Sequence, residues 1–399
     1  MKPTTPPNRL SAFAVTAPGL ETLCASELAD LGIRALPEEG GVAWKGSLES
    51  IALANLWLRT ASRVLVRVAE FKATAFFELE LNAKQIPWKR FVAANSEVEF
   101  RVTCHKSKLY HSDAVAQRFA TAVEWNVKGA KATRSKASDD DESLPPGDRQ
   151  LFIVRFVRDV CTVSVDSSGA LLHLRGYRQQ LAKAPLRETL AAGVLLGSGW
   201  TGDTPLVDPM CGAGTIPIEA ALIARHMAPG RARTFAFQRW PETDATMWAS
   251  LLDAARAGEL PKSPVAIAGS DRDDGAIAAS RANAERAGVS GDVDFSVQPI
   301  SALTPADPPG LIASNPPYGV RIGDTTGLRN LYAQLGNVAR RQRPGWELAL
   351  LSADRPLEQQ TKLAFEERFR TRNGGIPVHL VVARVPAVPA GKQSTGAST

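Results

Sequence analysis

The stretch Pro205-Leu-Val-Asp-Pro-Met-Cys-Gly-Ala-Gly-Thr-Ile-Pro-Ile-Glu-Ala-Ala-Leu222 joins a short apolar run, an acidic residue and a glycine-rich turn. The apolar run is typical of a buried strand, and the spacing after the turn predicts a helix that begins near Thr215. Gly212 and Gly214 allow the backbone to turn tightly and to approach a ligand closely. The amino terminus of the helix adds unpaired N–H groups at the same place. The stretch therefore predicts a strand, a ligand-binding turn and a helix in immediate succession.

Outside this stretch, two different patterns divide the chain. From residue 185 onward, helical stretches alternate with short apolar runs, which predicts a doubly wound, Rossmann-like α/β domain with a parallel sheet. The earlier residues mix helices with alternating strands in an α+β pattern. Strands are expected at 13–15, 42–44, 64–68, 98–102, 151–157, 162–165, 205–207, 265–268, 293–297, 311–313 and 348–351, and early helices at 20–31, 48–58 and 114–127. Ser112 or Asp113 is expected to cap the last of these helices, and residues 129–150 are expected to form a loop.

The acid before the glycine turn narrows the class of ligand. The turn lacks the third glycine of a dinucleotide fingerprint and the lysine of a phosphate-binding P-loop. An acid suits a ligand with an ammonium group and a ribose, and Asp271, at the end of the next apolar run, can accept both ribose hydroxyls. Asp271 follows Asp208 by 63 residues, so residues 225–262 are expected to be an insertion, and Asp273 or Asp274 to cap the next helix. A tight turn and a surface carboxylate without a ligand are the alternative.

The stretch Leu311-Ile-Ala-Ser-Asn-Pro-Pro-Tyr-Gly319 points to the chemistry. Two prolines stiffen the loop after the strand, because each fixes φ and neither donates a hydrogen bond. The side-chain oxygen of Asn315 and the carbonyl oxygen of Pro316 can then accept the two hydrogens of an exocyclic amine. Tyr318 offers a flat face for a base that is unpaired or flipped. A proline-rich turn after a buried strand is the alternative without function.

Composition limits the class of protein. The chain has 399 residues, of which 44% are apolar and 22% charged, as in globular proteins of two or three domains. No stretch of about 18 apolar residues occurs, so no membrane association is expected. Cys24, Cys104, Cys161 and Cys211 form no CxxC pair and the five histidines no ligand set, which predicts a cytoplasmic protein without metal. For Cys211, packing within the turn is expected rather than nucleophilic attack on a base.

The charge distribution suggests a polyanion as partner. Residues 51–200 carry 22 lysines and arginines against 15 acidic residues, whereas residues 201–300 carry 9 against 13. Within the basic half, Lys106, Lys108, Tyr110 and His111 bring basic and aromatic side chains into one loop, which suits a single-stranded RNA end. A merely solvated basic surface is the alternative.

These motifs resemble those of the bacterial THUMP-domain class I RNA guanine-N2 methyltransferases, and in particular the amino-terminal half of the 23S ribosomal RNA enzymes. The resemblance extends over roughly residues 11–385. It rests on Asp208–Gly214, Asp271 and Asn315–Tyr318, and before them on Phe13–Leu31, Val98–Val127, His173–Arg178 and Ala184–Glu188.

The resemblance implies a ferredoxin-like domain (1–60), a THUMP-like RNA-binding domain (61–168), a class I methyltransferase domain (169–386) and a disordered tail (387–399). It implies S-adenosylmethionine as cofactor and guanine N2 in RNA as the target, with 23S ribosomal RNA as the first expectation. The implied catalytic residues are Asn315, Pro316, Pro317 and Tyr318, and the implied cofactor-binding residues are Asp208, Pro209, Cys211, Gly212, Ala213, Gly214, Thr215, Asp271, Arg272 and Gln298. RNA is expected at Lys106, Lys108, Tyr110, His111, Arg175, Arg178 and Arg321.

The sequence departs from this family pattern at two places. An acid that would accept the adenine amino group after the third strand is replaced by Gln298 and Pro299, and an acid after the Tyr-Gly pair by Val320 and Arg321. Gln298 can substitute through its side-chain oxygen, and Arg321 can contact phosphate. Transfer RNA guanine N2, N6-adenine in DNA, and a non-catalytic RNA-binding or ribosome-assembly role are the alternative functions.

Overall fold

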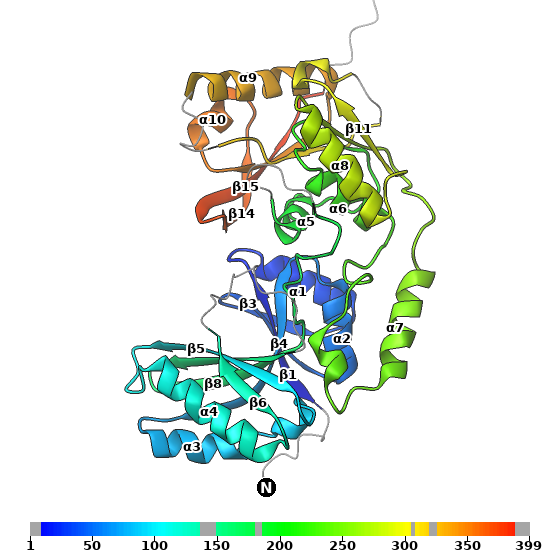
Figure 1. Cartoon of the computed structure of the whole chain (residues 1–399). Coiled ribbons are helices and arrows are strands. Elements are labelled where there is room, and N and C mark those ends of the chain that lie inside the picture. Colours follow the sequence, from blue (N-terminus) through cyan, green and yellow to red (C-terminus); the bar gives the residue numbers. More distant parts are fainter. Residues whose placement is uncertain (1–8, 136–148, 180–185, 305–307, 319–324, 388–399) are drawn as a thin grey trace, which may run out of the picture. The chain divides into compact units, whose positions relative to one another are not determined.

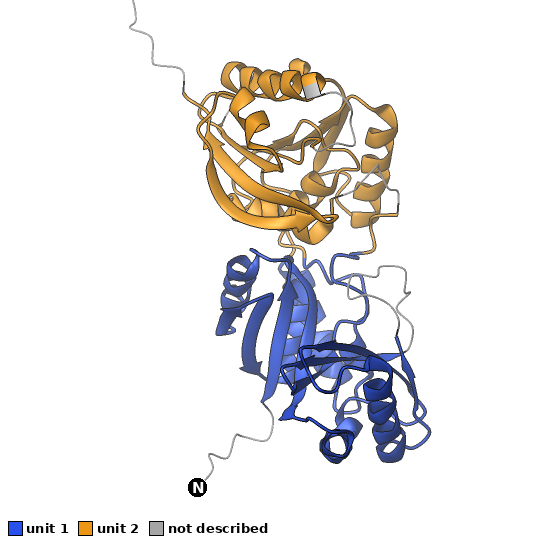
Figure 2. Cartoon of the chain, turned by 90° about the vertical axis from the view of Figure 1, so that its left-hand side faces the viewer, with its two compact units in different colours: residues 1–175, 228–258 blue, residues 176–227, 259–399 orange. Residues whose placement is uncertain are grey.

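The computed structural model describes residues 9–135, 149–179, 186–304, 308–318 and 325–387 (Figure 1). The chain forms two compact units, coloured separately in Figure 2. Unit 1 comprises residues 1–175 and 228–258, and unit 2 comprises residues 176–227 and 259–399. The chain therefore leaves unit 1, returns to it for about thirty residues within the sequence of unit 2, and leaves it again. The expected tail lies, apart from Ala387, outside the described residues.

Unit 1 is built on one eight-stranded sheet in the order β2-β3-β1-β4-β8-β7-β5-β6. Strand β5 pairs in parallel with β6 and β7, and the other neighbours are antiparallel. Because β4 pairs with β1 on one side and β8 on the other, the two expected amino-terminal modules share this sheet. The strands are β1 (Leu10–Thr16), β2 (Ala35–Glu38), β3 (Gly41–Gly46), β4 (Ala61–Lys72), β5 (Glu97–His105), β6 (Lys131–Arg134), β7 (Gln150–Val157) and β8 (Val160–Asp166).

An aromatic core holds the helices of unit 1 on this sheet. The ring of Trp88 packs edge-on against Phe100, Phe119 and Phe152, with centroids 5.0–6.3 Å apart. These rings come from β5, α4, β7 and a short 3-10 turn, so the contact ties the second half of the sheet to its helices. The helices are α1 (Glu21–Asp30), α2 (Leu48–Trp57), α3 (Phe76–Gln85), α4 (Ser112–Asn126) and α7 (Ala245–Ala257), with 3-10 turns η1 (Trp88–Arg90) and η2 (Ala236–Arg239).

Two local expectations for unit 1 are wrong. Residues 131–134 form β6 rather than loop, because their backbone pairs with β5; residues 136–148 lie outside the described part. Neither Ser112 nor Asp113 caps α4, whose N-cap is His111 without a side-chain bond. Both side chains instead contact Arg134 of β6. A capping motif is recognised from neighbouring residues only, so it could not indicate this contact with a distant strand.

Unit 2 is the doubly wound domain that the sequence predicts, with strand order β11-β10-β9-β12-β13-β15-β14. The first five strands run parallel. Strand β15 runs antiparallel to both β13 and β14, so the edge strand β14 again has the direction of the first five. The strand order reverses between β9 and β12. Because β9, β10 and β12 are parallel, their carboxyl ends lie at the same edge of the sheet, where open α/β sheets bind ligands at such a switch point. The strands are β9 (Leu206–Asp208), β10 (Ile267–Asp271), β11 (Val293–Val297), β12 (Leu311–Ser314), β13 (Glu347–Ser352), β14 (Glu366–Asn373) and β15 (Ile376–Arg384).

Helices cover both faces of this sheet. Side chains of α9 and α10, including Tyr332, Leu335 and Leu357, form a buried cluster with Ile312 and Leu350 of the strands. Every residue of α6 is buried, as expected for a helix that follows directly from the central strand. The helices are α5 (Glu188–Gly197), α6 (Thr215–Ala224), α8 (Asp274–Ala287), α9 (Thr325–Gln342) and α10 (Arg355–Gln360), with the 3-10 turn η3 (Ile300–Ala302).

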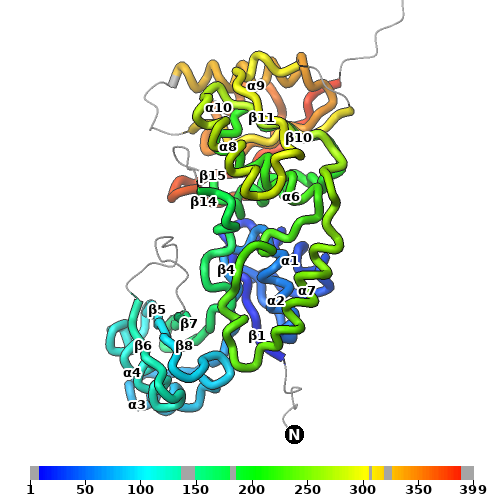
Figure 3. The backbone as a smooth tube through the Cα atoms, turned by 45° about the vertical axis from the view of Figure 1, so that its right-hand side comes forward, coloured from blue at the N-terminus to red at the C-terminus, as the bar shows by residue number. Residues whose placement is uncertain are grey.

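The expected insertion is confirmed, and residues 228–258 of it fold against unit 1. Trp248 of α7 packs edge-on against Phe235 and Phe237, at 5.5 Å from each ring centroid. Figure 3 traces α7 beside α2, which it contacts. Arg233 donates hydrogen bonds to the carbonyl oxygens of Leu171 and Leu174, so the segment is fixed by polar as well as apolar contacts.

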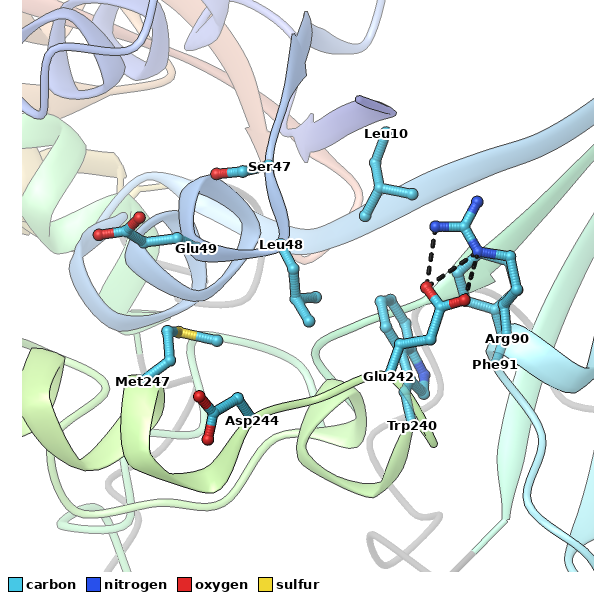
Figure 4. Close-up of a pocket in the computed structure, with 10 residues that line it drawn as sticks. All are labelled: Leu10, Ser47, Leu48, Glu49, Arg90, Phe91, Trp240, Glu242, Asp244 and Met247. Atoms are coloured by element: carbon cyan, nitrogen blue, oxygen red, sulfur yellow. Dashed lines mark hydrogen bonds and ion pairs between the residues drawn. The ribbon is translucent and has the colours of Figure 1, made fainter. Parts of the chain in front are cut away.

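Trp240 ties the same segment of residues 228–258 to Phe91 and to Gln150 of β7. Its ring meets Phe91 edge-on at 5.0 Å, and its indole N–H donates to Oε1 of Gln150 at 2.8 Å. Figure 4 shows Trp240 on the wall of a cavity of about 740 Å³ that also has Leu10, Met247 and the ion pair between Arg90 and Glu242 in its lining. The buried ring and its satisfied N–H therefore tie this segment to the rest of unit 1.

We expect Trp240→Ala to lower the free energy of unfolding of unit 1 by about 3–5 kcal/mol, because it removes a buried ring and leaves Oε1 of Gln150 without the donor it has in the wild type. Denaturant titration followed by fluorescence measures the change. Trp125→Ala is the matched control: that ring is 74% exposed, so its loss should change the same quantity by less than about 0.5 kcal/mol. Equal effects of the two substitutions would contradict the anchoring role.

Candidate functional site

A hydrogen bond between two neighbouring strands lies at the centre of the candidate site. Asp208, the last residue of β9, is buried, and its Oδ1 accepts from the hydroxyl of Ser314 at 2.7 Å and from the backbone N–H of Met210 at 3.1 Å. Burial raises the pKa of the Asp208 carboxyl to about 7, against the lowering effect of these two hydrogen bonds. Ser314 is the last residue of β12, so this bond connects the glycine turn with the Asn-Pro-Pro-Tyr loop.

The glycine turn has the conformation that its sequence requires. Gly212 and Gly214 have φ of 53° and 81°, in the left-handed region, and Gly214 is the N-cap of α6. A Cβ on Gly214 would lie 3.0 Å from both Phe295 and Ser280, so a larger residue would also be crowded. The backbone N–H of Gly212 donates to Oδ2 of Asp271 at 3.0 Å, which brings the two acidic motifs together.

A cavity of about 630 Å³ opens beside this turn, within the usual size range for small-molecule sites. Its lining includes four of the expected cofactor residues and one of the expected catalytic residues: Pro209, Asp271, Arg272, Gln298 and Pro317. The remaining lining residues are Met210, Asp273, Pro299, Ile300, Gly327, Leu328, Asn330, Leu331 and Gln334. The lining thus combines charged and polar side chains around Asp271 with apolar side chains such as Ile300 and Leu328, which fits a ligand with a ribose and a flat heterocycle.

Several expected cofactor residues belong to the turn but do not line the cavity. Cys211, Ala213 and Thr215 are buried and absent from the described cavity lining. The thiol of Cys211 lies 4.0 Å from the hydroxyl of Ser280, and burial raises its pKa well above the usual value. A buried, protonated thiol is a poor nucleophile, which supports the packing role expected for Cys211.

Asn315 presents an acceptor atom two residues before Pro317 of the cavity lining. Its Oδ1 is buried and has no hydrogen-bond partner among the described residues, although a buried polar atom is normally satisfied. Pro316 is buried, while Pro317 reaches the cavity lining. An acceptor held without a partner on a stiff loop is suited to receive a donor from a bound substrate.

Tyr318 is held by a residue that the sequence did not point to. Its hydroxyl accepts a hydrogen bond of 2.8 Å from the side-chain amide of Asn373, at the end of β14. Burial raises the pKa of the Tyr318 phenol, so the side chain stays neutral in the physiological range. Asn373 lies 55 residues from Tyr318 and carries no motif, so no signal in the sequence pointed to this contact.

Three further sets of cavity or site residues were missed as well. Met210 and Pro299 are neighbours in sequence of predicted site residues, and Ser314 directly precedes the predicted loop. Their place next to these motifs was the only signal in the sequence that could have indicated them. The α9 residues Leu328, Leu331 and Gln334 carry only the spacing of an amphipathic helix. That signal predicts a buried face but does not distinguish a cavity wall from a core. The sequence predicted Asp273 or Asp274 as the cap of α8, and Asp273 is the N-cap. Asp273 also lines the cavity.

In unit 1, the basic and aromatic loop between β5 and α4 is exposed. Lys106, Lys108, Tyr110 and His111 all reach solvent, and the rings of Tyr110 and His111 lie 4.0 Å apart. The loop is fixed from below, because the backbone N–H of Lys108 donates to Oδ1 of Asp159 at 2.7 Å and the side chain of Leu109 is buried. The four side chains therefore project from a defined backbone.

Arg175 and Arg178, by contrast, have structural roles. Arg175 is buried and donates to the carbonyl oxygens of Leu172 and Arg59 at 2.9 and 2.8 Å. The Arg178 side chain is only 6% exposed and pairs with the buried Glu188 at 3.1 Å. The expectation that they grip RNA is not supported by these placements, because little of either guanidinium faces solvent. Arg321 lies outside the described residues, as do Ala184 and Pro185 of the expected 184–188 segment.

Comparison with known proteins identifies the family. Residues 175–381 match the RMKL-like methyltransferase domain, and residues 11–65 match the RlmL ferredoxin-like domain. A protein of Synechocystis named putative RNA methyltransferase is 34% identical and is aligned over 92% of this chain and 95% of its own length. The chain belongs to the RMKL-like methyltransferase family. It is therefore an enzyme that transfers methyl groups from S-adenosylmethionine.

Other relatives of this methyltransferase are larger. The Marinomonas protein named ribosomal RNA large subunit methyltransferase K/L is 36% identical over 92% of this chain, but over only 52% of its own length. The chain thus spans about half the length of the K/L relatives it matches.

Solved structures agree with the fold expected for the methyltransferase. A putative methyltransferase named SMU.472, complexed with SAH, has a TM-score of 0.84 at 28% identity and covers 96% of this chain and 100% of its own. A Listeria monocytogenes protein described as a predicted N6-adenine-specific DNA methylase has a TM-score of 0.83 at 31% identity, with 95% and 97% covered. Both support the expected combination of a ferredoxin-like start and a Rossmann-like methyltransferase domain.

Two kinds of feature are absent from the part of the methyltransferase that the structure describes. Among the helices of the described ranges, none combines the length and the apolar character needed to cross a membrane. The described side chains also include no group of three or more histidine, cysteine, aspartate or glutamate residues arranged to hold a metal ion.

We expect Asp208 to make the methyltransferase less stable as the pH rises from about 4 to about 7. The folded protein keeps this proton up to a pKa of about 7, whereas the unfolded chain releases it near the ordinary value of 3.8. Across this interval the unfolded state binds fewer protons, so the free energy of unfolding decreases as the pH increases. Asp208→Asn removes this contribution. Denaturant unfolding of the ligand-free protein should show a shallower decline for the variant, and identical pH profiles would refute the raised pKa.

Proposed function

We propose that this methyltransferase methylates the N2 amine of guanine in RNA, with 23S ribosomal RNA as the first candidate substrate. The observation that carries the proposal is the buried Oδ1 of Asn315, which has no hydrogen-bond partner among the residues that the structure describes. An exocyclic amine supplies the hydrogen-bond donor that this oxygen lacks, and the carbonyl oxygen of Pro316 is available in the same loop for the second hydrogen. Accepting both hydrogens would direct the nitrogen lone pair towards the methyl donor.

The cavity residues fit S-adenosylmethionine. When bound, that cofactor would supply an electrophilic methyl group, which would pass to the target nitrogen as the bond from the methyl carbon to sulfur breaks. Asp271 and Gln298 both line the cavity, and in this proposal Asp271 accepts the ribose hydroxyls while Gln298 meets the adenine with its side-chain amide. Asp208 holds the turn and, when ionised, favours a nearby ammonium group. The positive end of the α6 dipole faces the same turn.

The choice of RNA rests on unit 1 and on the relatives' names. The exposed loop with Lys106, Lys108, Tyr110 and His111 combines charge for phosphates with rings for unstacked bases. The curated relatives from Synechocystis and Marinomonas are named RNA and ribosomal RNA methyltransferases. All four cysteines are free, which suits the cytoplasmic site of action expected from the sequence.

DNA N6-adenine methylation is the second candidate, because the Listeria structure carries that description and the Asn-Pro-Pro-Tyr loop would accept an adenine amine in the same way. Transfer of labelled methyl from S-adenosylmethionine to total RNA and to genomic DNA, both from a strain that lacks the protein, separates the candidates. Label in N2-methylguanosine of large ribosomal RNA supports the proposal. Label in transfer RNA moves the substrate and keeps the chemistry, label in DNA favours the second candidate, and cofactor binding without transfer to any substrate favours an assembly role.

We expect Asn315→Ala to raise the activation barrier by roughly 2–4 kcal/mol, which corresponds to a loss of roughly 30- to 1,000-fold in the rate of transfer. The variant loses one amine acceptor, whereas calorimetric binding of S-adenosylmethionine should persist. Asn337→Ala is the control, since Asn337 is exposed on α9 and bonds only the neighbouring Arg340 among the described contacts. Near-normal transfer by the Asn315 variant would refute the assigned role.

We expect the double substitution Lys106→Ala, Lys108→Ala to weaken RNA binding and to reduce the slope of log K against log salt by about 2, because about one phosphate contact is lost per lysine. Filter binding at several salt concentrations measures both quantities. Lys45→Ala, Lys84→Ala removes two exposed charges elsewhere in unit 1 and should leave the slope unchanged. If both double variants lose the same slope, the charge of the loop has no special role.

A further inference from the structure

Tyr318 is the only residue of the Asn-Pro-Pro-Tyr loop whose side chain is tied to the β14–β15 hairpin by a described hydrogen bond. The amide of Asn373 donates to its hydroxyl at 2.8 Å, and this bond is partly buried. A bond of this kind lies outside any motif of the sequence, since the partners are 55 residues apart. It places a residue of the antiparallel edge of the sheet against the ring on which a target base would stack.

The hairpin gives Asn373 little freedom to move. Asn373 pairs with Ile376, so Gly374 and Gly375 form a two-residue turn, and both have positive φ, at 55° and 85°. Positive φ at both central positions is the geometry of the tight turn that matches the twist of antiparallel strands. Strand β15 in turn pairs with β13 over six residues, so the position of the tip is set by the central sheet.

The strand that carries Asn373 is also locked by packing. Phe369 and Thr371, which share its face of β14, are buried. A Cβ on Gly197 of α5 would lie 2.7 Å from the ring of Phe369, which shows how closely the helix and the strand approach. The position of Asn373 is therefore fixed both by strand pairing within the sheet and by packing of β14 against α5.

The backbone end of Tyr318 is stiff for a different reason. It follows Pro316 and Pro317, which limit rotation of the preceding backbone. Pro316 is buried and Pro317 belongs to the lining of the cofactor cavity, so the start of the side chain is fixed relative to that cavity. The remaining freedom lies in the two side-chain torsions of Tyr318, which the bond to Asn373 restricts at the far end of the ring.

We propose that Asn373 is a positioning residue for methyl transfer: by holding the Tyr318 hydroxyl, it fixes the ring at the angle at which the target base stacks. The inference rests on the proposed function, in which a flipped base enters beside Tyr318. A stacking platform fixed in advance places the amine at attack distance without loss of ring freedom during the reaction. Asn373 touches neither base nor cofactor in this role and acts through Tyr318.

A double-mutant cycle tests this role in the full-length protein. Asn373→Ala and Tyr318→Phe each delete the same hydrogen bond, so each should slow single-turnover methyl transfer by about three- to tenfold, the value of one such bond. The double variant should be no slower than the slower single variant, because the bond can be lost only once. The dissociation constants for S-adenosylmethionine and for RNA should stay within about twofold of wild type, since a merely destabilised hairpin would also weaken binding.

Asn82→Ala provides the matched control. The Asn82 amide also donates a partly buried bond of 2.8 Å, to the carbonyl of Glu78 on α3 of unit 1, and its loss should leave single-turnover transfer unchanged. A wild-type rate for Asn373→Ala, or a double variant in which the two losses multiply, would overturn the positioning role. If the wild-type enzyme methylates another base, or another atom of guanine, only the proposed substrate is refuted. The same double-mutant cycle, measured with that base, would still decide the role of Asn373.

Discussion

The hydrogen bond from Ser314 to the buried carboxyl of Asp208 is the contact on which the arrangement of the site depends. Its partners are the last residues of two adjacent parallel strands, and each opens a functional loop. Because Asp208 is buried, a carboxyl without a hydrogen-bond partner there would cost free energy. The bond from Ser314 avoids this cost and also holds the two loops in a fixed relative position. The glycine turn and the Asn-Pro-Pro-Tyr loop thereby meet at one edge of the sheet.

Around this contact, rigidity comes from three different physical sources. Left-handed glycines and close packing hold the first loop, and two prolines stiffen the second. Strand pairing holds the third element, the β14–β15 hairpin, whose Asn373 reaches Tyr318. Each source preorganises polar groups where a small ligand and an amine would lie. Such preorganisation is how an enzyme can favour transfer chemistry that needs positioning more than acid–base catalysis.

The segment of residues 228–258 shows how an insertion can serve a second unit. Its aromatic side chains and Arg233 complete the core and the polar contacts of unit 1, although its neighbours in sequence belong to the methyltransferase sheet. Unit 1 therefore depends on residues from the middle of the other unit. A separately expressed amino-terminal fragment would lack part of its own core.

The sequence by itself determined the fold class, the parallel strands and both motif loops, because these depend on local signals: apolar periodicity, glycines that need positive φ, and prolines that fix it. It also indicated the insertion, from the distance between Asp208 and Asp271. Only the tertiary structure decided where side chains meet. Asn373, the α9 wall of the cavity and the burial of Arg175 and Arg178 follow from pairings between distant segments, and no local pattern encodes such contacts.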